Sequence, residues 1–202
     1  MKTTKILIAL LTVATLAVAT ERARITPANA STIEITGTST VHVWKMEGTT
    51  IAGAIDIAPA VAADPTRAES WKSDKPALVT VTIPVTNIKS EHAKMDSVML
   101  TAMNAKRFPE VKYELTQATP LKGTADSFLI RTKGKLTIAG VTRDLDMDVT
   151  AAKNGAKRYV ITGEAPMTMT SFGIKPPTAM LGTIRSGDAV KVSFRWVVER
   201  AE

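Results

Sequence analysis

The sequence predicts a mainly β, antiparallel fold that includes one amphipathic helix. Three observations support this prediction. Apolar and polar residues alternate along most of the chain after residue 30, glycine-containing turns separate neighbouring runs, and residues 91–105 follow a helical spacing instead. Alternation with period two gives a strand one apolar and one polar face, which is typical of antiparallel strands packed on one side only.

Six alternating segments are expected to form strands. They cover Ile33–Ile35, Val79–Val85, Val111–Leu115, Leu136–Ile138, Leu145–Val149 and Val190–Val198. The dipeptides Ala139-Gly140 and Asn154-Gly155 supply the glycine that tight hairpin turns favour. Pro84 lies in one run, and because proline cannot donate a ladder hydrogen bond it leaves the pairing of that strand open; a bulge or an edge would accommodate it.

The expected helix spans Glu91–Ala105. Ser90 is a suitable N-cap, Glu91 lies favourably in the first turn, and Pro109 prevents continuation. The apolar residues of this segment recur at i, i+3, i+4, i+7 and i+8 and form one stripe: Met95, Val98, Met99, Ala102 and Met103. Such a helix can lie across a sheet or close one end of a barrel.

Strands with a single apolar face bury it either between two packed sheets or inside one closed barrel. The alternation does not distinguish these two architectures. A barrel of about eight strands can also hold one small ligand in its interior. The chain has no tandem repeat and no long linker, so residues 31–202 are expected to form one domain.

The N-terminus has the pattern of a secretory signal peptide over residues 1–30. Lys2 and Lys5 precede the uncharged apolar run Ile6–Ala19, which is short for a membrane span. Cleavage is expected after Ala19 or after Ala30, and the sequence leaves both sites open. The absence of cysteine excludes disulfides and thiol chemistry. We therefore expect a protein secreted across the inner membrane into the periplasm.

The charge of the chain does not indicate a nucleic-acid partner. The formal net charge is +7, from 26 Lys and Arg against 19 Asp and Glu, and the basic residues are spread along the chain. No run reaches the density of a nucleic-acid footprint. After signal cleavage no transmembrane segment is expected, and a homodimer is compatible with the sequence.

Several segments resemble the YceI-like family. Their order and spacing carry the resemblance over about residues 32–198, nearly the whole expected domain. The segments are Gly37–Trp44, Glu91–Asp96 continuing to Phe108–Glu110, Gly134–Thr142, Phe172–Ile174 with Pro176–Pro177, and Ser186–Val190.

The resemblance implies a lipocalin-like antiparallel barrel of about eight strands with a helix over one region. It also implies an exported, non-catalytic protein that holds a polyisoprenoid, of the quinone or prenyl phosphate class, in an elongated apolar pocket. Fold alone does not fix function, so the ligand is an expectation by analogy. No cofactor is expected.

The expected ligand-binding residues are apolar positions on the inward faces of strands and helix. They are Val81, Ile83, Met95, Met99, Met103, Tyr113, Leu136, Ile138, Phe194 and Trp196. The methionines suit a flexible chain because thioethers adapt their shape, although ordinary core filling explains any single one. His92 is a candidate for contacting a polar head group, with surface packing the favoured alternative.

Other chemistries have weaker support. Asp144, Asp146 and Asp148 lack the glycine and glutamate spacing of a calcium loop and are expected on the solvated face of a strand. The two histidines, His42 and His92, show no metal-ligand spacing, and the sequence contains no HExxH and no GxSxG motif.

Two alternatives to a lipid carrier remain. One is an envelope structural or stress-response interaction protein whose core is filled. The other is an isomerase or hydrolase acting on a lipid, which requires His92 or Glu91 to point inward with a partner. A cavity in the fold distinguishes the first alternative from a carrier, and the direction of these two side chains tests the second.

Overall fold

A computed structural model describes residues 23–67, 71 and 77–200. Residues 1–22 of the expected signal segment lie outside the described residues, whereas residues 23–30 are described. The strands are β1 Ala23–Pro27, β2 Thr32–Ser39, β3 Val43–Gly48, β4 Ala52–Ile57, β5 Leu78–Pro84, β6 Ile88–Lys89, β7 Glu110–Thr124, β8 Ser127–Ile138, β9 Val141–Lys153, β10 Arg158–Thr168, β11 Thr178–Ala179 and β12 Ile184–Arg200. The helices are α1 Pro59–Ala63 and α3 Ala93–Ala102, with 3-10 turns η1 Val85–Asn87, η2 Thr170–Phe172 and η3 Met180–Gly182.

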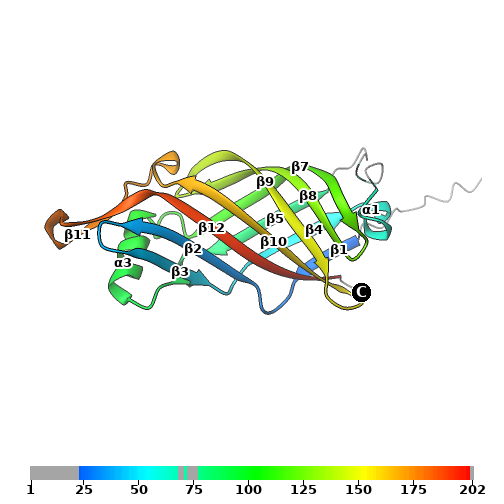
Figure 1. The fold of residues 1–202 in the computed structure, drawn as a ribbon, viewed down its shortest axis with the longest axis horizontal. Coiled ribbons are helices and arrows are strands. Elements are labelled where there is room, and N and C mark those ends of the chain that lie inside the picture. The colour runs from blue at the N-terminus through cyan, green and yellow to red at the C-terminus, as the bar shows by residue number, and fades with distance from the viewer. Residues whose placement is uncertain (1–22, 68–70, 72–76, 201–202) are drawn as a thin grey trace, which may run out of the picture.

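The strands form one curled antiparallel sheet. Its order is β1-β4-β5-β7-β8-β9-β10-β12-β2-β3-β6, and β1 pairs with β12 as well as with β4. The long strand β12 pairs with β2 through its first part and with β1 through its last residues. This double pairing brings the sheet back onto itself as a lipocalin-like barrel, with α3 beneath the end that carries β11 (Figure 1).

The six expected strands are confirmed in β2, β5, β7, β8, β9 and β12, except that Val85 lies beyond β5 and begins the turn η1. The strands β3, β4 and β10 are not among the six predicted segments. In two of them small residues and proline interrupt the alternation, at Gly53 in β4 and at Gly163 and Pro166 in β10. Together with the short strands β1, β6 and β11, these bring the number of strands in the described residues to twelve, above the expected eight or so. Pro84 is the last residue of β5, so it does not disturb the ladder.

The predicted hairpin turn at Ala139-Gly140 is confirmed. Both residues have left-handed φ angles, 49° and 80°, and Ile138 pairs directly with Val141. Two consecutive positive φ values define the two-residue turn whose twist matches that of antiparallel strands. The ring of Phe108 covers this turn, and a side chain at Gly140 would lie 2.5 Å from it.

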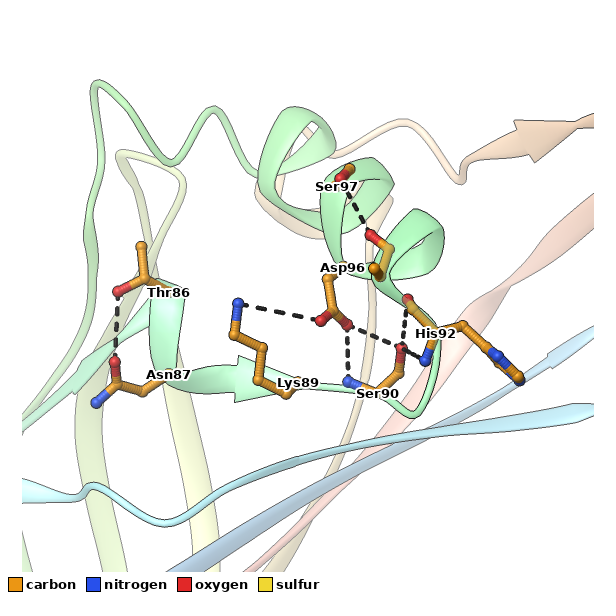
Figure 2. Close-up of polar contacts among 8 residues, drawn as sticks. Thr86, Asn87, Lys89, Ser90, His92, Asp96 and Ser97 are labelled. Carbon is orange, nitrogen blue, oxygen red and sulfur yellow. Dashed lines mark hydrogen bonds and ion pairs between the residues drawn. The ribbon is translucent and has the colours of Figure 1, made fainter.

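The helix is shorter than predicted at both ends. It starts at Ala93 with His92 as the N-cap residue, whereas Ser90 was expected to cap it. Instead, the backbone N–H and the hydroxyl of Ser90 both donate to the Asp96 carboxylate, at 2.7 and 2.8 Å (Figure 2). The Ser90 backbone hydrogen bond is the main reason that the pKa of Asp96 lies below its ordinary value. The chain before the helix is therefore tied to its first turn by a side chain from within the helix.

The helix also ends earlier than predicted, at Ala102 instead of Ala105. Met103 is the C-cap residue, and its N–H donates to the carbonyl of Met99. Asn104 then adopts a left-handed φ of 49°, a conformation that asparagine tolerates and that ends helices. The predicted stripe nevertheless packs inward: Met95 and Met99 contact one buried cluster, and Ala102 and Met103 contact another.

Candidate functional site

The barrel interior contains an apolar cavity of about 140 Å³. Its wall comes from most of the strands and from the segment that ends α3. The residues that line it are Ile33, Ile35, Ile51, Val81, Ile83, Ile88, Met103, Val111, Tyr113, Leu136, Ile138, Leu145, Met147, Ala165, Met167, Val192, Phe194 and Trp196. None of these residues carries a formal charge, so the cavity suits an apolar guest.

The predicted interior residues separate into two groups. Eight of the ten line this cavity: Val81, Ile83, Met103, Tyr113, Leu136, Ile138, Phe194 and Trp196. Met95 and Met99 do not line it but pack against the cluster of buried residues that includes the lining residues Ile83 and Ile88. A helical stripe indicates which helix face is buried, but it does not identify what that face contacts.

Sequence reasoning missed several lining residues. Six of them belong to the alternating runs already described, so their spacing contained the necessary signal: Ile33, Ile35, Val111, Leu145, Met147 and Val192. The others come from strands or turns whose alternation is broken. They are Ile51, Ile88, Ala165 and Met167.

Two polar atoms are buried in the wall of this cavity without a hydrogen-bond partner. They are the hydroxyl of Tyr113 and the indole N–H of Trp196, whose residues are 8% and 3% exposed. Buried polar groups in proteins almost always have a partner, so each exception requires an explanation. Both residues line the same cavity although they lie on different strands, β7 and β12.

The position of the Tyr113 ring depends on a glycine. A Cβ atom at Gly134, on the neighbouring strand β8, would lie 2.4 to 2.5 Å from the ring and hydroxyl atoms of Tyr113. The missing side chain therefore lets the ring lie flat along the inner wall. Burial raises the pKa of the Tyr113 phenol. The nearby hydroxyl of Thr132 opposes this rise only in part, and it donates its own hydrogen to the carbonyl of Met147 at 2.9 Å.

A second glycine makes room for another aromatic ring of the cavity wall. Gly163 on β10 is the register partner of Phe194 on β12, and a Cβ atom there would lie 2.8 Å from the ring. Aromatic rings that cover strand glycines across the ladder compensate for the packing that glycine lacks. The two glycine–aromatic pairs thus shape the interior surface.

The charged residues lie on the outer face of the sheet. The expected solvated face of β9 is confirmed, since Asp144 pairs with Lys135 at 2.6 Å and Asp148 pairs with Arg131 at 2.9 Å, all exposed. His92 and Glu91 are also exposed (Figure 2 shows His92 directed away from α3), and neither contributes to the cavity wall. The lipid-acting enzyme hypothesis required one of them to point inward, so the geometry disfavours it.

The described residues contain no cluster of three or more histidine or acidic side chains that could hold a metal ion. Within the same part of the chain, no helix is long and apolar enough to cross a membrane.

Comparison with solved structures confirms the architecture. BcnA of Burkholderia cenocepacia aligns with a TM-score of 0.63 at 19% identity, covering 83% of this chain and 95% of the other. A polyisoprenoid binding domain from Saccharophagus degradans, implicated in plant cell wall breakdown, gives 0.64 at 12% identity and covers 89% and 99%. The Campylobacter jejuni YceI protein gives 0.54 at 18% identity and covers 78% and 84%.

These identities are low, so the structural matches establish the fold alone. A comparison with curated proteins found no match. The family assignment comes from the sequence itself, because the family model for the YceI-like domain matches residues 24–198. This match covers nearly all of the described residues, including β1 through most of β12, and the chain therefore belongs to the YceI-like domain family.

Proposed function

We propose that this protein is an exported, non-catalytic carrier that sequesters an isoprenoid or a similar lipid inside its barrel. The observation that carries the proposal is the apolar cavity, whose wall has no charged residue. The similar domain from Saccharophagus degradans is described as polyisoprenoid binding. Transfer of an apolar chain from water into such an interior contributes roughly 25 cal/mol for each Å² buried.

The size of the cavity limits what enters without rearrangement. A volume of about 140 Å³ is close to that of an engineered cavity of about 150 Å³ that accepts benzene. One ring or a short prenyl unit therefore fits as the side chains stand. A longer chain needs side chains to move aside, and Met103, Met147 and Met167 in the wall are suited to this because methionine is flexible.

The proposal of export is based on the signal-like N-terminus. The position of strand β1 favours one of the two cleavage sites. Strand β1, Ala23–Pro27, pairs with β4 and β12. Cleavage after Ala30 would remove this strand, whereas cleavage after Ala19 would retain it. We therefore propose that the mature periplasmic protein begins at Thr20. Intact-mass measurement of the secreted protein distinguishes this start from Ser31.

Native mass spectrometry of the secreted protein, followed by organic extraction and lipid identification, tests the carrier function. We expect a stoichiometric isoprenoid or related lipid. Ala165→Leu, which extends a buried side chain into the cavity, should reduce the bound fraction. Thr162→Leu is the matched control because Thr162 lies on the outer face of the same strand, β10.

A protein that is empty and takes up neither an added quinone nor a prenyl phosphate would contradict the carrier function. It would favour the alternative of an envelope interaction protein that uses its surface.

A further inference from the structure

We propose that the end of the barrel that carries β11 docks on a bilayer of anionic lipids, into which a strained apolar tip inserts. The tip consists of two loops: residues 40–43, which form the β2–β3 turn and the first position of β3, and residues 180–183, which form the turn after β11. This inference goes beyond the proposed function, because it concerns the surface of the protein and a membrane as its partner. It does not depend on which ligand the interior holds.

The exposed apolar side chains of the described residues gather at this tip. Six large apolar residues are exposed in that part of the chain, and four of the six belong to the tip: Val41, Val43, Met180 and Leu181. Met180 is 73% exposed and Leu181 is fully exposed. Single exposed apolar residues are normal on a protein surface, whereas a cluster of them indicates an interaction site.

Hydrogen bonds hold the two loops together as one unit. The backbone N–H of Thr40 donates to the carbonyl of Arg185 at 3.0 Å, and the backbone N–H of Arg185 donates to the Thr40 hydroxyl oxygen at 3.2 Å. The same hydroxyl donates to the carbonyl of Thr183 at 3.3 Å. Strand β11 pairs with the first residues of β12, and the turn between them projects beyond the rest of the barrel (Figure 1). The four apolar side chains are therefore presented together at one end of the molecule.

The backbone of the projecting turn is strained. Met180 and Leu181 have left-handed φ angles of 49° and 54°, and Gly182 follows with 87°. This conformation suits glycine and is unfavourable for residues with bulky side chains. The Leu181 side chain gains no burial within the protein in exchange, because it is fully exposed. Strain of this kind is typical of functional sites, and here it holds an apolar side chain in water.

The segments that build this end of the barrel carry no negative charge. Residues 37–46 and 173–187 contain no Asp and no Glu. The acidic residue that follows them, Asp188, accepts hydrogen bonds from the backbone N–H and the hydroxyl of Thr170, at 2.9 and 2.6 Å. An anionic surface that approaches the tip therefore meets no opposing carboxylate within either segment.

Two basic side chains of these segments are available to an anionic partner. Lys45 pairs with Glu47 at 2.7 Å. Lys175 and Arg185 are exposed, and neither forms an ion pair with an acidic group of the described residues; the Arg185 Nε donates to the carbonyl of Gly182 at 2.9 Å. Apolar side chains flanked by Lys and Arg are typical of surfaces that insert into the headgroup region of a bilayer.

A protein partner fits this tip less well than a bilayer. Four side chains on two loops expose less area than the roughly 800 Å² that each partner buries in a stable protein–protein interface. Insertion into a bilayer requires no matching surface, because acyl chains adapt to an apolar tip and lipid phosphates accept hydrogen bonds from its cations. The same end carries α3, whose C-cap residue Met103 lines the cavity, so docking brings this end of the cavity toward the bilayer (Figure 1).

Co-sedimentation of the secreted protein with vesicles tests the proposal. Mixed phosphatidylglycerol and phosphatidylcholine vesicles should bind the wild-type protein, whereas pure phosphatidylcholine vesicles or high salt should give weak binding. Leu181→Ser should lower the partition coefficient by roughly tenfold, because an apolar side chain no longer inserts. Leu78→Ser is the matched control: Leu78 is 54% exposed but pairs with Asp56 at the end of β4, where the chain continues into α1 at the opposite end of the barrel.

A charge variant tests the choice of anionic lipid. Lys175→Gln should lower binding to the phosphatidylglycerol vesicles by roughly fivefold and leave the weak binding to neutral vesicles unchanged. Lys122→Gln is the matched control, because Lys122 is an exposed lysine that pairs in register with Leu129 near the β7–β8 turn, away from the tip.

The strained turn provides a second readout. Leu181→Gly removes the apolar side chain and relieves the left-handed φ angle. Vesicle binding should therefore fall about as much as with Leu181→Ser, while the melting temperature stays the same or rises. A side chain that serves packing within the protein would instead lower the melting temperature, and this result would overturn the proposal.

Three further results would overturn it. They are an absence of vesicle binding by the wild-type protein, an equal loss of binding in Leu181→Ser and Leu78→Ser, and self-association in place of vesicle binding, which Leu181→Ser abolishes. The last result would assign the tip to a second copy of the chain. The carrier function is tested separately by the lipid bound in native mass spectrometry, which Leu181→Ser should leave unchanged, so a failure of docking is distinguishable from a failure of the carrier function.

Discussion

The β8–β9 hairpin has a filled half and a hollow half. Far from its turn, inward side chains from both strands form a tightly buried cluster: Phe128, Ile130, Val149 and Ala151. Nearer the turn, inward side chains of the same two strands line the cavity: Leu136, Ile138, Leu145 and Met147. One continuous ladder therefore provides both a packed core and the wall of a binding site.

Both halves have aromatic neighbours, but they are not equally filled. Trp71 and Tyr159 pack against the filled cluster, whereas Tyr113 and Phe172 pack beside the half that lines the cavity. Between the two halves, the inward face of β8 carries Thr132 and Gly134, a polar residue and a residue without a side chain. Alternation thus specifies which residues face the interior of a barrel, but not where that interior is filled.

The largest expected effect tests this contrast directly. Phe128→Ala in the filled half should lower the free energy of unfolding by about 3–5 kcal/mol, because it removes a 6% exposed ring and leaves a void among packed neighbours. Leu145→Ala in the hollow half should cost less, about 1–2 kcal/mol, because a side chain that faces a cavity already lacks partners on that side. Chemical denaturation measures both values.

Ligand binding should show the opposite order. Phe128→Ala should leave the affinity for a bound lipid nearly unchanged, and Leu145→Ala should alter it. Equal losses of stability at the two positions would contradict the division of the hairpin into a filled and a hollow half.

Much of this architecture was predictable from the sequence. The period of two located the strands that carry most of the wall, and the glycine of Ala139-Gly140 located the turn between β8 and β9. These features are local, since side-chain alternation and backbone φ angles depend on adjacent residues. The resemblance to the family supplied the barrel, which alternation alone left open against a sandwich.

The lining of the cavity was only partly predictable, since eight of the ten predicted residues contribute to it. Met95, Met99 and Met103 share one helical stripe, yet only Met103 lines the cavity, because burial on a helix face does not specify the neighbour. The unpartnered donors of Tyr113 and Trp196 arise from long-range packing. The role of Gly134 likewise depends on a ring from the next strand.

A smaller effect is expected at the boundary between the two halves. Gly134→Ala places a Cβ atom 2.4 Å from the Tyr113 ring, so the ring must shift toward the cavity. We expect a loss of about 1–3 kcal/mol in the free energy of unfolding, which is typical of overpacking. In a Tyr113→Leu background the ring is absent, and the same substitution should cost clearly less. An equal cost in both backgrounds, measured in a double-mutant cycle, would show that the ring does not cause the loss.

The smallest effect is expected on the outer face of the same hairpin. The Arg131 guanidinium donates to both carboxylate oxygens of Asp148, at 2.9 and 3.0 Å, and this hydrogen bonding lowers the pKa of Asp148. Both side chains are exposed, so water screens the ion pair. Asp148→Asn should therefore lower the free energy of unfolding by less than Leu145→Ala or Gly134→Ala does. Asp146→Asn is the matched control, because Asp146 lies on the same exposed face outside this two-point contact.

The contribution of this outer pair should depend on pH with a definite sign. A carboxyl group with a lowered pKa in the folded state stabilises the protein fully above its unfolded pKa of about 3.9 and loses this contribution as pH falls through the lower folded value. The denaturation midpoints of wild type and Asp148→Asn should therefore differ by a constant amount between about pH 5 and pH 7 and converge below about pH 4. A difference that grows on acidification would contradict the ion pair as its source.

An interior substitution such as Phe128→Ala changes apolar packing and no charge. The loss in the free energy of unfolding that it causes should therefore remain nearly constant over the same pH range, which distinguishes the inner face of the hairpin from the outer one.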